Sequence, residues 1–216
     1  MKIAVTGGIG SGKSSVAALL ADAVQADLFS ADLVCHELMQ PDADGWLGIV
    51  AAWGERYLKP DRSIDRGLMR DAVFRDEAMR KQLETILHPL IRRELMQKMA
   101  AVAGQGGRCV VEIPLLFEVG WQDEFDATVV VYAPEDVCVG RIVARDGIGE
   151  EAARRILDAQ MSPEKKAEMA THVISNAGLW AQTVQQVSSL ARLLEKKIKE
   201  RGKPADTARQ GLTPQN

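Results

Sequence analysis

A glycine-rich stretch near the amino terminus has the residue types needed to hold phosphate groups. Residues 7–14 read Gly-Gly-Ile-Gly-Ser-Gly-Lys-Ser and match the pattern G-x-x-x-x-G-K-[ST]. Glycines allow consecutive backbone N–H groups to converge on phosphate oxygens, the lysine reaches the β- and γ-phosphates, and the Ser14 hydroxyl can ligate Mg²⁺. The stretch therefore predicts a site for a nucleoside triphosphate with magnesium.

The flanking sequence supplies the structural context that this pattern requires. Residues 2–6 form a short apolar, β-branched run typical of a buried strand, and residues 13–24 repeat apolar side chains at helical spacing. A glycine turn that includes Gly-Lys-Ser by chance is the alternative, but here the glycines, the lysine and the hydroxyl are all in register. The residues predicted to bind ATP in this loop are Gly8, Ile9, Gly10, Ser11, Gly12, Lys13, Ser14 and Ser15.

The loop by itself does not identify the acceptor of the γ-phosphate. The same cradle serves hydrolases that use water and kinases that use an organic acceptor. A GTPase switch of the Ras or Gα type needs a guanine-reading segment such as N-K-x-D, and no such string occurs in the sequence. Residues elsewhere in the chain must therefore decide between these functions.

The composition is typical of a globular protein of one domain. The 216 residues are 46% hydrophobic and 26% charged, and the net charge of −3 gives no basic field for binding nucleic acid. The three cysteines are widely separated, which argues against a disulfide framework or a zinc site. The first apolar run is too short for a signal peptide, and no run is long enough to span a membrane. We expect a soluble, cytoplasmic protein, monomeric or weakly homo-oligomeric, without nucleic-acid or membrane partners.

Strand and helix patterns alternate along the chain and predict an α/β fold with a parallel sheet covered by helices on both faces. Further strands are expected around residues 26–29, 109–113, 127–132 and 172–174, and a final helix over about 177–199. Residues 65–99 are helical in pattern, and Pro89 is expected to start a new helix or to kink one. The expected parts are a nucleotide-binding core (1–30 and 105–200), a helical acceptor subdomain (31–104), a helical lid (141–166) interrupted at 146–149, and a disordered tail (201–216).

Two acidic residues follow or end predicted strands. Asp32 comes shortly after the strand at 26–29, where open α/β sheets bind ligands, but Ser30 or Asp32 could equally cap the helix over 33–39. Glu112 ends the next strand and could hold a water molecule on Mg²⁺, or it could be an acid without a role at a strand end. Both readings of each residue stay open at this point.

Arg141 and Arg145 lie four residues apart and share one face of a predicted helix. A solvent-exposed basic face is one explanation. The other is a clamp for phosphoryl oxygens, because a kinase needs cations that arrive over the phosphates when its lid closes.

Several motifs together resemble the dephospho-CoA kinase family, in order and spacing, over about residues 1–180. They are Thr6–Ser14, Ala31-Asp32, Leu87-His88-Pro89-Leu90-Ile91, Ile113–Glu118, Arg141, Arg145-Asp146 and Gln160. The resemblance implies a P-loop kinase that uses ATP and Mg²⁺ to phosphorylate the ribose 3′-hydroxyl of dephospho-coenzyme A, the last step in making coenzyme A.

The resemblance also implies roles for residues at the matching positions. Asp32 corresponds to the family's proposed base, and Lys13 and Arg141 to groups that act on the transferred phosphate, with Arg145 also on the lid. The acceptor pocket is implied for Pro114, Leu115, Leu116 and Phe117, with Glu118 helping to hold that loop. His88 shapes the pocket by resemblance, whereas a lone histidine is otherwise expected to be structural. Many family members have Asp-x-Asp where this chain has Ser30-Ala31-Asp32.

Two other functions remain to be distinguished from this one. Another P-loop kinase would phosphorylate a nucleoside or nucleotide, and a panel of acceptors would separate the two enzymes. A nucleotide-dependent binding protein would turn over ATP slowly, and no small acceptor would stimulate it.

Overall fold

The computed structural model describes residues 1–201 and contains a five-stranded parallel sheet in the order β2-β3-β1-β4-β5. The strands are β1 (Lys2–Thr6), β2 (Asp27–Ser30), β3 (Cys109–Glu112), β4 (Ala127–Tyr132) and β5 (His172–Ser175). The predicted strands are thus confirmed, with ends shifted by at most one residue. Because β1, β3 and β4 are buried on both faces, their sequences are continuous apolar runs.

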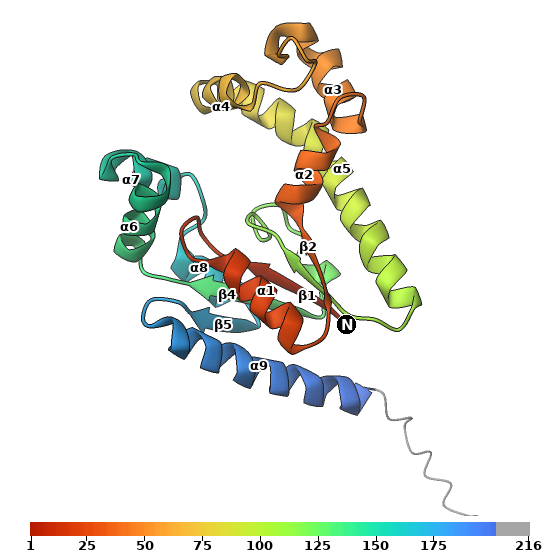
Figure 1. The fold of residues 1–216 in the computed structure, drawn as a ribbon, viewed down its shortest axis with the longest axis vertical. Coiled ribbons are helices and arrows are strands. Elements are labelled where there is room, and N and C mark those ends of the chain that lie inside the picture. The colour runs from red at the N-terminus through yellow and green to blue at the C-terminus, as the bar shows by residue number, and fades with distance from the viewer. Residues whose placement is uncertain (202–216) are drawn as a thin grey trace, which may run out of the picture.

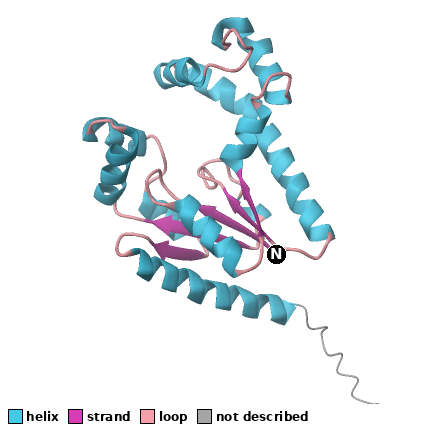
Figure 2. Ribbon diagram, in the orientation of Figure 1, coloured by secondary structure: helices cyan, strands magenta, loops and turns pink. Residues whose placement is uncertain are grey.

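Helices cover both faces of the sheet, as predicted (Figure 2). The helices are α1 (Lys13–Ala23), α2 (Ala31–Leu38), α3 (Asp44–Trp53), α4 (Arg66–Arg75), α5 (Glu77–Gly104), α6 (Glu135–Asp146), α7 (Glu150–Asp158), α8 (Pro163–Met169) and α9 (Trp180–Arg201). On one face α1 and α9 pack over Ile3 and Val5. On the other, α5 and α8 pack in a core that includes Ala4 and Val111. Alternate residues of β1 therefore serve opposite layers.

The segment between β2 and β3 is helical, and in Figure 1 its helices α3 and α4 lie farthest from the sheet. No new helix starts at Pro89, because α5 runs unbroken from Glu77 to Gly104 and keeps Leu87 and Ile91 buried on one side. The break falls instead at Asp76, whose backbone is extended and whose carboxylate accepts a hydrogen bond from the N–H of Met79. An N-cap at Asp76 thus separates α4 from α5. The helix start that was predicted at Pro89 does not occur.

Helices α6 and α7 form a pair with a small apolar cluster of their own, made by Val139, Ile142 and Ala153. The turn between them begins at Gly147, which ends α6 in the left-handed conformation (φ 67°) that glycine adopts without strain. Figure 1 shows this pair beside the sheet, away from the helical segment that contains α3 and α4. Ile9 of the phosphate loop packs against the same cluster, so these helices contact the loop directly.

Two expectations about the end of the chain have different outcomes. The last helix begins at Trp180 and extends to Arg201, a little later than predicted at both ends. The tail predicted over 201–216 lies outside the described residues, apart from Arg201 itself. Within residues 1–201 no helix has the length and apolar character needed to cross a membrane.

Candidate active site

The parallel register brings three strand ends to the same edge of the sheet. Glu112 at the end of β3 lies opposite Val5 of β1 on one side and Ser30 of β2 on the other. The chain therefore leaves the sheet at neighbouring points towards the phosphate loop, towards Asp32 and towards Pro114. Residues that are far apart in the sequence meet at this edge, which is where open α/β sheets bind their ligands.

The phosphate loop adopts a backbone that requires glycine. Gly10 (φ 77°) and Gly12 (φ 85°) are both left-handed, and Gly12 is the residue from which α1 begins. A Cβ atom on Gly12 would lie 2.3 Å from Nδ2 of Asn176, and one on Gly10 would lie 2.7 Å from the carbonyl oxygen of Cys138. The N-terminus of α1 thus faces the loop with free backbone N–H groups and a positive dipole end, which is an anion site.

The loop is held by hydrogen bonds from parts of the chain that no local motif connects to it. Asn176, which follows β5, is buried and donates from Nδ2 to the carbonyl oxygen of Ser11 (2.8 Å), while its own Oδ1 accepts from Thr183 (3.0 Å). Gln160 accepts the backbone N–H of Ile9 (3.2 Å). The sequence analysis assigned no role to Asn176, because a contact across 165 residues leaves no periodic or spacing signal.

Arg141 contacts the loop from the side of α6. Its guanidinium donates to the carbonyl oxygens of Gly10 (3.2 Å) and Ser11 (3.4 Å), and to that of Asn176 (2.8 Å). A charged donor thus holds three partly buried carbonyl groups, and at Ser11 it adds to the hydrogen bond from Asn176. In this structure Arg141 joins the phosphate loop to the end of β5.

Lys13 and Glu112 bring opposite charges to the start of α1. Burial lowers the pKa of the Lys13 ammonium below its ordinary value, while the carboxylates of Glu112 and Asp32 act in the other direction. Ser14 donates from Oγ to Oε1 of Glu112 at 2.6 Å. Glu112 therefore has a hydroxyl partner at the start of α1, and its role beside bound magnesium stays a prediction.

A hydroxyl and a carboxylate in contact are a donor set that fits Mg²⁺, which takes hard oxygen ligands and usually keeps water and substrate phosphates as the rest. Ser14 and Glu112 form this pair. Among residues 1–201 no group of three His, Cys, Asp or Glu side chains could by itself hold a metal ion. The pair would therefore hold magnesium together with a bound triphosphate.

A cavity of about 530 Å³ opens between this edge of the sheet and the helical segment. Lys13, Asp32 and Arg145 line one part of it, and apolar side chains of α5, including Leu87 and Ile91, line another. The cavity thus combines a charged end beside the phosphate loop with an apolar wall. This arrangement can hold a ligand that has both a polar group and an extended, less polar body.

Asp32 lies in the first turn of α2 with its side chain exposed. The N-cap position of α2 belongs to Ser30, and no side chain makes a cap hydrogen bond there. Capping by Asp32 is therefore wrong as an explanation of this residue. Its carboxylate instead lines the same cavity as Lys13.

The loop after β3 only partly matches its prediction. Pro114 and Leu115 line the cavity, whereas Leu116 (0% exposed) and Phe117 (6% exposed) do not, and both belong to the hydrophobic core. The expectation that Leu116 and Phe117 face the acceptor is wrong, because within the turns over residues 114–120 both of these side chains pack into the core. Glu118 is also absent from the lining; it accepts the N–H of Met161 (3.2 Å) and pairs with a lysine of α8.

His88 is half-buried on α5 and lies edge-on to Trp121, with ring centroids 6.2 Å apart and planes at 78°. Both rings line the cavity. The two readings of His88 are therefore compatible, since the imidazole packs against a neighbour and also forms part of the cavity wall. Trp121 was missed by the sequence analysis because an isolated aromatic residue in a loop has no pattern of its own.

The two arginines of α6 that the sequence analysis singled out differ in where they lie. Arg145 lines the cavity and binds the carboxylate of Asp146 through Nε (2.7 Å) and a terminal nitrogen (2.8 Å). Arg141 lies outside the cavity lining, against the phosphate loop. Of these two arginines, Arg145 is therefore the one that a ligand in the cavity could contact.

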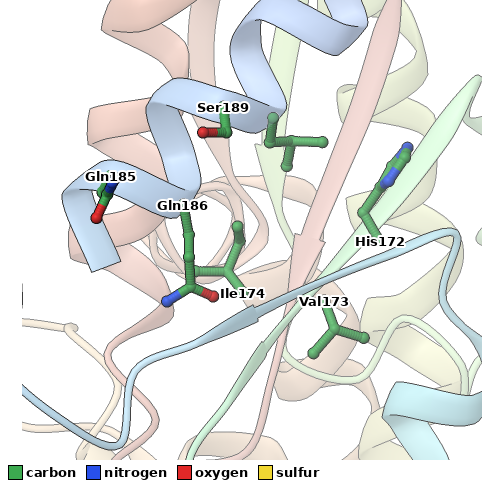
Figure 3. A pocket seen from close by; sticks show the side chains of 7 residues that line it. His172, Val173, Ile174, Gln185, Gln186 and Ser189 are labelled. Carbon is green, nitrogen blue, oxygen red and sulfur yellow. The ribbon is translucent and has the colours of Figure 1, made fainter. Parts of the chain in front are cut away.

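A second hollow, of about 360 Å³, lies between β5 and α9 (Figure 3). In Figure 3 Ile174 of the strand lies beside Gln186 of the helix, whereas the side chain of Val173 points away from the helix. Its lining contains no lysine, arginine or carboxylate, and burial lowers the pKa of His172, which favours the neutral ring. This hollow lacks the charges that phosphate chemistry requires.

Comparison with known proteins identifies the family of this chain. The sequence matches the profile of dephospho-CoA kinase over residues 1–182. A dephospho-CoA kinase of Desulfotalea psychrophila is 38% identical over 187 residues, which are 87% of this chain and 94% of that protein. A dephospho-CoA kinase structure from Campylobacter jejuni has a TM-score of 0.68 at 29% identity and covers 92% of this chain and 100% of its own.

A further solved structure, TT1252 from Thermus thermophilus, has a TM-score of 0.75 at 32% identity, covering 91% of this chain and 97% of its own. The P-loop kinase fold predicted from the sequence is thus confirmed. The chain belongs to the dephospho-CoA kinase family, whose reaction is the ATP-dependent phosphorylation of dephospho-CoA in the final step of coenzyme A biosynthesis.

Proposed function

We propose that phosphoryl transfer takes place in the cavity of about 530 Å³, from ATP on the phosphate loop to the ribose 3′-hydroxyl of dephospho-CoA. The observation that carries this proposal is that Lys13 and Asp32 line one cavity. Lys13 is a cation that can bind the β- and γ-phosphates, and Asp32 is a carboxylate that can accept a hydrogen bond from a hydroxyl. A ligand between them is held for an in-line transfer, in which positioning supplies most of the rate acceleration.

The donor side depends on the loop from Gly8 to Ser15. Backbone N–H groups of this loop and of the first turn of α1 hold the phosphate oxygens, and Lys13 neutralises charge on the β- and γ-phosphates. Magnesium, when bound, would balance the remaining phosphate charge, and Ser14 with Glu112 are the residues that would hold it.

The acceptor side depends on Asp32. Its exposed carboxylate is free to accept a hydrogen bond from the 3′-hydroxyl, to orient that oxygen, and to take the proton late in the transfer. Ser30 stands where many family members have a second acid, so in this chain one carboxylate performs this task alone.

The two lid arginines have different roles towards the transferred phosphate. Arg145 exchanges Asp146 for phosphoryl oxygens when the substrates are bound, because it already lines the cavity. Arg141 acts through the loop that it holds. In this proposal residues 141–166 are the lid, 31–104 form the acceptor subdomain, and 1–30 with 105–200 form the nucleotide-binding core.

We further propose that the protein works in the cytoplasm as a monomer or weak homo-oligomer, without nucleic-acid or membrane partners. The net charge of −3 supports the exclusion of nucleic acid, since no overall basic field attracts a polyanion. Its anionic substrates are held by the local cations around the cavity.

Asp32→Asn tests the proposal, with Glu37→Gln as the matched control. Glu37 is an exposed acid on the same helix, outside the cavity lining, and its ion pair with Lys98 is long at 3.7 Å. We expect Asp32→Asn to lower kcat by about 10²–10⁴-fold with unchanged ATP affinity, whereas Glu37→Gln keeps both values. A near-normal kcat for Asp32→Asn would remove this carboxylate from the reaction.

A further inference from the structure

A lysine on α8 is fully buried and takes no part in the phosphate chemistry described above. The side chain of Lys166 is 0% exposed, although lysine is almost never fully buried without a partner. Its Nζ lies 2.8 Å from Oε1 of Glu118 and donates to the carbonyl oxygen of Pro114, also at 2.8 Å. Lys166 therefore binds both ends of the loop that follows β3.

One of these two acceptors is shared with the strand that leads into the phosphate loop. The carbonyl oxygen of Pro114 also accepts a hydrogen bond from Oγ1 of Thr6 (3.2 Å), the last residue of β1. Glu112, which contacts Ser14, lies only two residues before Pro114. Through the carbonyl group of Pro114, the Lys166 ammonium group is thus linked to Thr6, which precedes the phosphate loop, and to Pro114 itself, which lines the cavity.

The other acceptor ties the lid segment to the same loop. Glu118 accepts the N–H of Met161, in the connection between α7 and α8, in addition to pairing with Lys166. The end of the proposed lid therefore contacts the Pro114–Glu118 loop through two residues, Met161 and Lys166. Lys166 itself does not line the cavity; it acts on a ligand through the residues that it holds, and, in addition to burial, its charge helps to lower the pKa of Lys13.

We propose that Lys166 is a positioning residue for the acceptor. It fixes the cavity wall formed by Pro114 and Leu115 relative to Lys13 and Asp32, and so sets where the acceptor lies. The inference rests on the proposed function, because it takes the cavity of about 530 Å³ to be the acceptor site. The role follows from burial: in a site closed to water, a charge-assisted hydrogen bond holds a backbone carbonyl more firmly than a neutral one.

The first test compares Lys166→Met with Lys165→Met in the full chain. Lys165 is the exposed neighbour in the first turn of the same helix, where its backbone N–H donates to Ser162, so it controls for loss of a lysine in α8. We expect Lys166→Met to raise the KM for dephospho-CoA about 10-fold or more, since small misplacements of a bound reactant are costly. The dissociation constant of a non-hydrolysable ATP analogue should change less than about twofold.

A double variant separates positioning from stability. Removing one partner of a buried ion pair destabilises a protein, whereas replacing both by apolar side chains of similar size is often neutral. Lys166→Met with Glu118→Gln removes both charges and keeps a side-chain oxygen for the N–H of Met161, so it should recover most of the Tm lost in Lys166→Met. The KM for dephospho-CoA should stay raised, because the Pro114 carbonyl keeps only the neutral hydroxyl of Thr6 as a donor. If Lys166→Met does not fold, this double variant alone decides the question.

Either of two results overturns the proposal: a KM for dephospho-CoA within twofold of the wild-type value in the folded variant, or a KM that returns to that value together with Tm in the double variant. ADP release by the wild-type enzyme separates a failure of the proposed function from a failure of the role of Lys166. If dephospho-CoA does not stimulate its ADP release, the proposed function fails; if it does and KM is unmoved by the variants, only the role of Lys166 fails.

Discussion

Replacing Gly12 by alanine probes how the phosphate loop is built. The residue has φ 85°, and a left-handed backbone costs a residue with a Cβ about 1–2 kcal/mol. The new Cβ would lie 2.3 Å from Nδ2 of Asn176, so that the amide must move and lose its bonds to Ser11 and Thr183. At about 1 kcal/mol for each buried hydrogen bond, the free energy of unfolding should fall by about 3–4 kcal/mol.

A domain of this size loses about 2–4 °C in Tm for each kcal/mol, so Gly12→Ala should unfold roughly 6–16 °C below the wild type. The measurement is thermal unfolding of the ligand-free protein, followed by circular dichroism. Gly8→Ala in the same loop is the control for stability, because a Cβ there meets nothing within 4 Å. Equal Tm values for Gly12→Ala and the wild type, or equal losses in both variants, would refute the packing of Asn176 against the loop.

Three further predictions concern charge and metal at the site. Because burial lowers the pKa of Lys13, its cation is lost at a lower pH than in an ordinary lysine. As pH rises, kcat/KM for ATP should therefore fall before kcat does, because kcat/KM reports the free enzyme and kcat the enzyme with ATP bound. The same alkaline fall in Lys13→Arg would argue against Lys13 as the group that titrates. Because Arg141 holds the carbonyl oxygens of Gly10 and Ser11, Arg141→Ala should weaken ATP binding as well as lower kcat, as measured by equilibrium binding and turnover; an unchanged ATP affinity would argue against its hold on the loop. Ser14→Ala should raise the magnesium concentration for half-maximal activity about 10-fold, and an unaltered magnesium titration would contradict the pairing with Glu112.

Features encoded within a few residues were predictable from the sequence. The strand, the glycine loop and α1 follow one another without a gap, so motif and periodicity identify them together. The interruption of the helix at 146–149 was likewise expected, since glycines there break a helical pattern. Asp32 could be placed near the loop because parallel strands direct their carboxyl ends to one edge.

The sequence did not predict which side chains of a loop or helix are buried, because burial depends on segments that are distant in the sequence. Leu115 and Leu116 are adjacent and chemically alike, yet one lines the cavity and the other is in the core, since the direction of each side chain depends on the turn after Pro114. Lys166 follows an exposed lysine and looks like any surface residue in the sequence. Its burial depends on Glu118, which lies on a different segment.

The central claim is that the γ-phosphate goes from the loop around Lys13 to a ribose hydroxyl held beside Asp32. Its most direct test is ADP release with and without dephospho-CoA, followed by phosphorus NMR of the product to locate the new phosphate. The account predicts that dephospho-CoA stimulates ADP release by orders of magnitude and that the phosphate lies on the 3′-oxygen. ADP release that dephospho-CoA does not stimulate, or a phosphate on another oxygen, would contradict it.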